Sequence, residues 1–266
     1  MNRSVFVVLL GIGSLGVAIA FAQARTRAVF AEDGFRTAGR RAAAMTLLAL
    51  VLLLTVAIPF STGLAGAEPD VKGLSLVSLF AVHAILLLFL ICYYLLSGRR
   101  SPAGFLALSS PRPAADLSVG VLIGALGWVL TDAAAMVGIG VWLAQRAKSA
   151  APPAPSEVAP TILWILGRPL WVRILIVITA MVVEELFFRS FLQTRVGPVA
   201  ATLMFTAAHG VYGQPLFLVG ILVISAVLSA TFALYKNVLP CIVAHGTFDA
   251  IQMFVVIPLV VKPLTG

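Results

Sequence analysis

The chain has 266 residues, of which 61% are hydrophobic and only 11% charged, with a mean hydropathy of +1.09. This composition lies far outside the range of a soluble domain of this length and indicates an integral membrane protein. The formal net charge of +8 is typical of basic flanks that meet anionic lipid head groups. No segment resembles a nucleic-acid-binding module, so we expect the lipid bilayer, and no nucleic acid, as a partner.

Long apolar runs follow one another along the chain. A hydrocarbon core of about 30 Å takes about 20 helical residues to cross, and seven runs are long enough. They cover residues 4–24, 42–64, 74–97, 116–144, 171–196, 214–234 and 238–261. A shorter run from Pro198 to about Val211 adds an eighth helix. We therefore expect an all-α, polytopic bundle of about eight transmembrane helices.

The first run, residues 4–24, ends in "AFAQA", which resembles a signal-peptidase site. Its removal would leave the arginines between residues 25 and 41 outside the cytoplasm, against the positive-inside rule. We therefore predict that the segment is retained as a helix, with the N-terminus outside.

A Pro/Ala-rich loop, "KSAAPPAPSEVAP" at residues 148–160, divides the chain. Residues 1–160 form the predicted N-terminal membrane region, which carries few ionisable groups at membrane depth. Residues 161–266 carry most of them and form the second predicted region.

Seven ionisable side chains fall within the apolar runs. They are Asp132, Glu184, Glu185, Asp249, His83, His209 and His245. Each charged group at the bilayer centre costs at least about 2.5–3.5 kcal/mol on insertion scales, so such groups face the bundle interior and usually mark function. For His83 and Asp132, which lie on different helices, we predict a hydrogen-bonded pair between helices, with a substrate gate as the alternative.

Helix punctuation places the remaining groups at similar depths. Gly197-Pro198 stops one helix and starts the next, and Asn237 with Pro240 opens the last one. If both turns lie at the cytoplasmic face, a rise of 1.5 Å per residue puts the polar groups of three helices at depths of about 12–20 Å. These groups are Glu184, His209, His245 and Asp249. We expect them to meet in one layer.

Spacing within each helix predicts which side chains meet. Three pairs lie four residues apart and share a helix face: Glu185 with Arg189, Phe205 with His209, and His245 with Asp249. Glu184 projects about 100° away from Glu185 and is free to face a cavity. The Glu185–Arg189 pair is either a structural ion pair or takes a direct part in the chemistry, and we expect Phe205 to serve packing.

This layer is suited to hydrolysis by an activated water molecule. A carboxylate held away from bulk water, here Glu184, can serve as general base, and His209 can share the water's proton. His245 and Asp249 can hold an oxyanion if His245 is protonated or Asp249 is neutral. No serine lies in a nucleophile-elbow context, which argues against a covalent mechanism.

Three motifs resemble those of one family. "EELFFR" (184–189), "FTAAH" (205–209) and "HGTFD" (245–249) resemble EExxxR, FxxxH and HxxxN/D of the CPBP family, also called Abi. This family includes the type II CAAX prenyl endopeptidases and bacterial bacteriocin-processing and self-immunity proteins. The resemblance covers about residues 165–255 and makes residues 161–266 the expected catalytic region.

The resemblance implies a glutamate-dependent intramembrane endopeptidase. Glu184 would be the base, His209 its assistant, and His245 with Asp249 the oxyanion site. We count Glu185 among the candidate catalytic residues, and Arg189 and Phe205 as support. Two residues depart from the pattern: Ser190 replaces the usual Gly after the arginine, and Asp249 replaces the Asn of the prenyl endopeptidases.

Several alternatives remain open. The resemblance implies no required cofactor, but two histidines and one or two carboxylates could instead form a catalytic zinc site. A proton-coupled transporter or a non-catalytic scaffold or immunity protein could also use this fold. For the protease we expect a membrane protein or lipidated peptide as substrate and a bacterial inner or cell membrane as location.

Overall fold

The structure is a computed structural model that describes residue 30 and residues 33–64, 75–146, 160–212 and 215–259. All regular structure in these residues is helical, and five helices are long and apolar enough to cross a membrane. They are Ala38–Gly63, Leu76–Leu96, Pro113–Gly138, Phe217–Tyr235 and Leu239–Leu259. The predicted all-α membrane bundle is thereby confirmed, while the predicted helix at 4–24 and its orientation lie outside the described residues.

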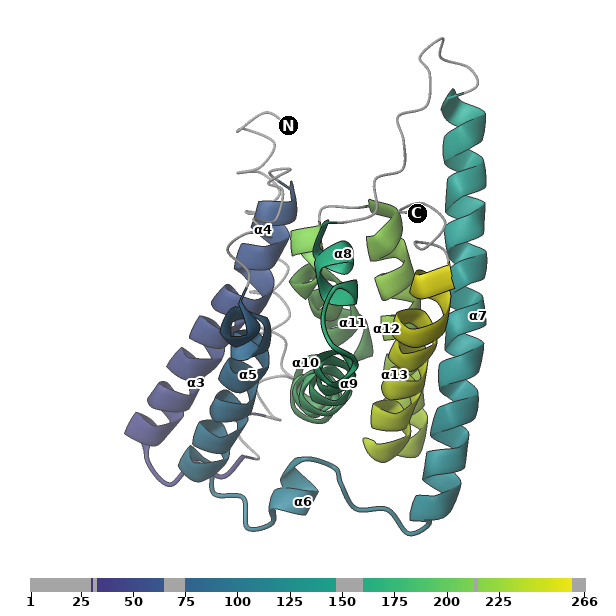
Figure 1. Ribbon diagram of the computed structural model, residues 1–266. Helices are drawn as coiled ribbons and strands as arrows, with labels where there is room; N and C mark the ends of the chain where they lie inside the picture. The colour runs from purple at the N-terminus through teal and green to yellow at the C-terminus, as the bar shows by residue number, and fades with distance from the viewer. Residues whose placement is uncertain (1–29, 31–32, 65–74, 147–159, 213–214, 260–266) are drawn as a thin grey trace.

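Two neighbouring helical segments begin the described bundle (Figure 1). The first consists of α3 (Ala38–Leu52), which continues through the π-helical η1 (Leu53–Ala57) into α4 (Ile58–Leu64). Beside α3 lies α5 (Leu76–Leu96). Ser75 starts α5 because its hydroxyl accepts a hydrogen bond from the backbone N–H of Ser78, and the Ser78 hydroxyl in turn accepts one from the N–H of Ser75.

A second group forms around the long helix α7 (Pro113–Arg146), which packs against α12 (Pro215–Tyr235) and α13 (Leu239–Ile251) (Figure 1). A Cβ atom added at Gly124 of α7 would lie 2.4 Å from the carbonyl oxygen of Ala244 on α13. Gly120 lies one turn earlier, and a Cβ atom added there would lie 2.6 Å from the Cβ atom of Val243 on α13. This small-xxx-small spacing lets the two backbones approach, as is common between membrane helices.

One continuous helical segment, residues 170–196, stands between these groups, and we call it the charged helix. It consists of α9 (Leu170–Thr179), η2 (Ala180–Glu184), η3 (Leu186–Gln193) and α10 (Thr194–Val196), where η2 and η3 are π-helical. π-helical turns are rare and often occur at functional sites. The predicted helix at 171–196 is therefore present, although its buried charges distinguish it from the five apolar spans.

The charged helix ends as the sequence predicts. Gly197 adopts φ +87°, a left-handed value that favours glycine. Pro198 then opens α11 (Pro198–Ala208) in the first turn, where a missing N–H is harmless. The predicted eighth helix is thus present, though it ends before Val211. Three short helices complete the described chain: α6 (Pro102–Phe105), α8 (Pro160–Leu166) and η4 (Gly210–Tyr212), and η5 (Gln252–Val256) extends α13.

A buried acid secures the last turn of the charged helix. Asp33 is fully buried and accepts hydrogen bonds from Tyr93 Oη at 2.7 Å, from Arg195 Nη2 at 2.8 Å and from Arg99 Nε at 3.3 Å. Arg195 is only 4% exposed. The segment before α3 is therefore tied to α5 and to the charged helix.

The close approach of α7 and α13 predicts the effect of two matched substitutions. Gly124→Ala should lower the free energy of unfolding by about 1–3 kcal/mol, because its methyl group overpacks the contact with Ala244. Gly140→Ala on the same helix meets nothing within 4 Å and should be neutral or slightly stabilising. Thermal unfolding in detergent micelles measures both, and equal stabilities would contradict the packing described.

Candidate active site

The structure brings together the polar side chains that the sequence places in one layer. Glu184 and Glu185 lie on the charged helix, His209 follows α11, and His245 and Asp249 lie on α13. Three distances connect them: 3.9 Å from Glu184 Oε2 to His209 Nε2, 2.9 Å from Glu185 Oε1 to His245 Nδ1, and 3.4 Å from His245 Nε2 to Asp249 Oδ2. The predicted proximity of these groups is thus observed.

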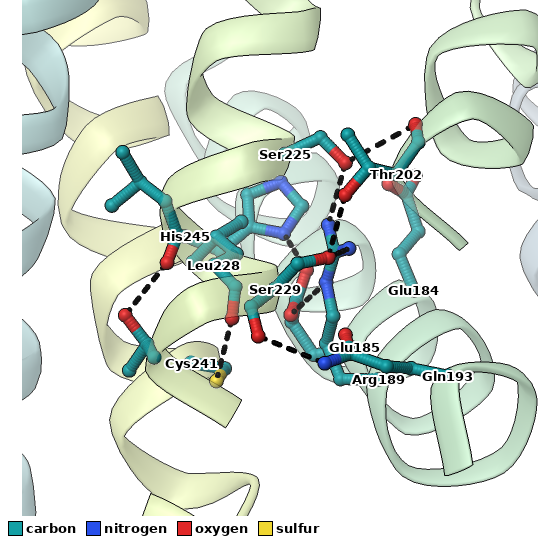
Figure 2. A network of polar contacts seen from close by, with 12 residues as sticks. Glu184, Glu185, Arg189, Gln193, Thr202, Ser225, Leu228, Ser229, Cys241 and His245 are labelled. Carbon is teal, nitrogen blue, oxygen red and sulfur yellow. Dashed lines mark hydrogen bonds and ion pairs between the residues drawn. The ribbon is translucent and has the colours of Figure 1, made fainter. Parts of the chain in front are cut away.

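Glu185 is the centre of a buried polar network (Figure 2). Its side chain is fully buried, as is that of Arg189, which donates from Nε to Glu185 Oε2 at 3.1 Å. His245 reaches the other carboxylate oxygen from the opposite side. Because a carboxylate only accepts, the His245 Nδ1 atom carries the hydrogen in this contact. Both oxygens of Glu185 are therefore engaged.

The two remaining nitrogens of Arg189 donate hydrogen bonds to side chains of α12. Nη1 donates to Ser229 Oγ at 2.7 Å and Nη2 donates to Ser225 Oγ at 3.1 Å. Thr202 of α11 donates to the Ser229 hydroxyl at 2.7 Å, and Gln193 donates to the Ser229 carbonyl oxygen at 2.8 Å. The guanidinium is thus satisfied at all three nitrogens, as a buried charge requires.

The two serines are site-supporting residues that the motif analysis missed. Ser225 and Ser229 are buried and lie four residues apart in the otherwise apolar helix α12. This spacing puts both hydroxyls on one helix face. The same interval that reveals the motif pairs could therefore have identified them.

Phe205 packs among the charged and ionisable groups. It is 2% exposed, and the Arg189 Cζ atom lies 4.9 Å from its ring centroid, within cation–π range. Its centroid is 4.6 Å from that of His209 and 6.0 Å from that of His245. The ring therefore packs against both imidazoles, consistent with the packing role expected for it.

Glu184 differs from its neighbour Glu185. Its side chain is 13% exposed, and its Oε1 atom lies 3.1 Å from His83 Nε2 on α5. Its Oε2 atom has no hydrogen-bond partner within the described part of the chain. The His209 Nδ1 atom lies 2.8 Å from the carbonyl oxygen of Phe205, so this nitrogen donates. In the neutral ring, Nε2 then presents its lone pair toward Glu184.

The predicted pairing of His83 with Asp132 is wrong. Nε2 of His83 contacts Glu184, and Nδ1 has no hydrogen-bond partner among the described residues. Asp132 lies on α7, which packs against α12 and α13. The partner of His83 depends on which helix lies next to α5, and the sequence pattern does not define this.

Ser190, a departure from the family pattern, is also accounted for. Its buried hydroxyl donates to the carbonyl oxygen of Leu106 at 2.6 Å. Where glycine would only save space, the serine links the charged helix to the segment that follows α6.

Among the described residues, no group of three or more His, Cys, Asp or Glu side chains is placed to hold a metal ion. This part of the chain therefore shows no preformed site for the zinc alternative. Both ring nitrogens of His245 already contact carboxylates.

The comparison with protein families agrees with the three motifs. Residues 166–251 match the family described as type II CAAX prenyl endopeptidase Rce1-like. The resemblance inferred from the motifs is thereby confirmed for this segment, which contains all three of them. Neither the curated proteins nor the solved structures include a match to the chain.

The match and the fold together support one class of protein. The family supports a protease of the CAAX type that works within the membrane. The five apolar helices make the chain an integral, multi-pass membrane protein. A membrane-embedded protease of this kind acts on substrates that lie in, or are anchored to, the bilayer.

The buried Glu185–Arg189 pair predicts a strong coupling. Arg189→Met should lower the free energy of unfolding by about 3–5 kcal/mol, because it leaves a buried carboxylate uncompensated. The double variant Glu185→Gln/Arg189→Met should lose less than the sum of the two single variants. A double-mutant cycle by thermal unfolding in micelles measures this, and additive losses would contradict the pairing.

Proposed function

We propose that the protein is an intramembrane endopeptidase that hydrolyses a peptide bond of a membrane-associated protein or lipidated peptide, with Glu184 as general base. One contrast supports this proposal most strongly. Glu185 has both oxygens engaged, whereas Glu184 is partly exposed and presents Oε2 toward His209 without a hydrogen-bond partner among the described residues. A carboxylate so placed is suited to accept a proton.

In the proposed reaction, a water molecule donates one hydrogen toward Glu184 Oε2 and the other toward His209 Nε2. Both atoms are acceptors in the arrangement described above, and their separation of 3.9 Å is too long for a direct hydrogen bond. As the water oxygen attacks the peptide carbonyl, its proton passes to Glu184. Glu184 then delivers this proton to the leaving amine, so the carboxylate is restored.

His245 and Asp249 are proposed to stabilise the oxyanion that forms during the attack. Their side chains lie 3.4 Å apart, and that of Asp249 is 27% exposed. A hydrogen carried by His245 Nε2 or by Asp249 Oδ2 and directed at the oxyanion supplies the donor that it needs, whereas a bare carboxylate would repel it. Glu185, held by Arg189, positions the ring of His245 from its other nitrogen.

We place the enzyme in a bacterial inner or cell membrane. The chain is rich in Ala and has 14 Arg against 4 Lys, a composition typical of high-GC bacteria, where protein prenylation is not expected. A membrane-anchored peptide or lipoprotein-like substrate therefore fits better than a prenylated protein.

The proposed chemistry makes a direct prediction. Purified protein in nanodiscs should cleave members of a library of membrane-anchored peptides. Glu184→Ala and His209→Ala should each lower the rate by at least about 10²-fold, the usual contribution of a general base or its partner. Asp132→Asn, which changes an intramembrane acid on α7 instead, is the matched control and should leave the rate unchanged. Mass spectrometry of the products measures cleavage.

A chelator distinguishes the two hydrolytic mechanisms in the same assay. Cleavage that survives chelation supports the glutamate-dependent reaction. Loss of cleavage on chelation, with recovery on adding zinc, would assign the reaction to a metal centre. Cleavage that is indifferent to both substitutions would contradict the proposed base and its partner.

A further inference from the structure

His83 reaches the proposed site from outside the segment that matches the family model. It lies on α5, whereas the match covers residues 166–251. Its Nε2 atom is 3.1 Å from Glu184 Oε1, and its side chain is 15% exposed. This contact joins the N-terminal region to the carboxylate that is proposed to act as base.

Packing between two helices fixes this contact. Phe89 and Tyr93 of α5 meet the charged helix at Phe187 and Phe191, with ring centroids 5.6 Å apart for Phe89–Phe187 and 4.6 Å for Tyr93–Phe191. The contacting residues advance in the same direction along both helices, so the two helices lie side by side with the same N-to-C direction. His83 meets Glu184 on the N-terminal side of these aromatic contacts, six residues before Phe89 on α5 and three residues before Phe187 on the charged helix.

The buried face of α5 also restrains His83. Leu86, Leu90 and Tyr93 are at most 3% exposed, and they follow His83 at intervals of three, seven and ten residues. These intervals trace one face of a helix. The imidazole is thus presented by a packed face toward the charged helix.

In its contact with Glu184, His83 acts as the hydrogen-bond donor. A carboxylate oxygen accepts, so His83 Nε2 carries the hydrogen and donates to Glu184 Oε1. The other oxygen, Oε2, is the one that lies toward His209. Engagement of Oε1 thereby leaves Oε2 to take the proton from water, and the carboxylate is held from rotating between the two.

We propose that His83 is a positioning residue, which holds the Glu184 carboxylate in the orientation for general-base catalysis. The active site then comprises α5 as well as the three motif-bearing helices. This inference rests on the proposed function, and it assigns to the N-terminal region a part in the chemistry.

Kinetics with two His83 variants tests the proposal. His83→Ala should lower kcat about 10- to 100-fold, as loss of an orienting partner typically does, with KM little changed. His83→Gln should recover most of the rate, because the glutamine Nε2 can donate to Glu184 in place of the imidazole Nε2. Leu87→Ala, on the exposed side of the same helix, is the control and should match the wild type.

The results separate the two claims. If the wild type cleaves and Glu184→Ala does not, but His83→Ala keeps the wild-type kcat or alters KM alone, the His83 role is overturned while the protease stands. An equal loss in His83→Ala and His83→Gln would also overturn it, since it would indicate disturbed packing and no need for a donor. Thermal unfolding of both variants identifies such a disturbance.

A readout that needs no turnover tests the contact itself. In protein with ¹⁵N-labelled histidine, the His83 ring should show a hydrogen on Nε2, and Glu184→Ala should shift its resonances. Asp132→Asn should leave them in place. An unchanged His83 spectrum in Glu184→Ala would overturn the contact, and with it the positioning role, whether or not the protein cleaves any peptide.

Discussion

A fully buried ion pair, Glu185 with Arg189, is the constraint on which the rest of this structure depends. Charges at this depth are tolerated only if they are paired and hydrogen-bonded. Arg189 meets that demand with Ser225 and Ser229 of α12, and Glu185 meets it with His245 of α13. Three helices are therefore held in one arrangement by this ion pair and its partners, and the orientation of the candidate active site follows from it.

This network explains why two adjacent glutamates have such different hydrogen-bond partners. Glu185 points into the network and has no free oxygen, whereas Glu184, one position earlier, is turned toward His83 and His209. The backbone around them is π-helical, and such wide turns displace neighbouring side chains from the regular helical spacing. Glu185 thus stabilises the helix arrangement, and Glu184 is left for the proposed role of general base.

The sequence allowed much of this arrangement to be predicted, because the relevant signals are local. Hydropathy identified the helices, and intervals of four residues predicted the contacts of Glu185 with Arg189 and of His245 with Asp249. Counting from Gly197 and Asn237 placed groups of three helices at similar depths, and the structure brings those groups together. Each of these inferences needs only the geometry of one helix.

The predictions that failed needed knowledge of helix neighbours. His83 contacts Glu184 across 101 positions in sequence, and hydropathy does not reveal that α5 is parallel to the charged helix. A second contact of this kind buries Arg195, which pairs with Asp33, far away in the chain. Both cases are tertiary pairings of ionisable groups, which depend on packing and not on periodicity.

The isosteric variants Glu184→Gln and Glu185→Gln test whether Glu184 serves catalysis and Glu185 serves stability. Peptide cleavage and thermal unfolding would be measured for both in the same nanodiscs. We expect Glu184→Gln to abolish cleavage while unfolding as the wild type does. We expect Glu185→Gln to unfold at a clearly lower temperature, because the buried Arg189 loses its counter-ion. Full cleavage by Glu184→Gln, or wild-type stability of Glu185→Gln, would contradict these roles.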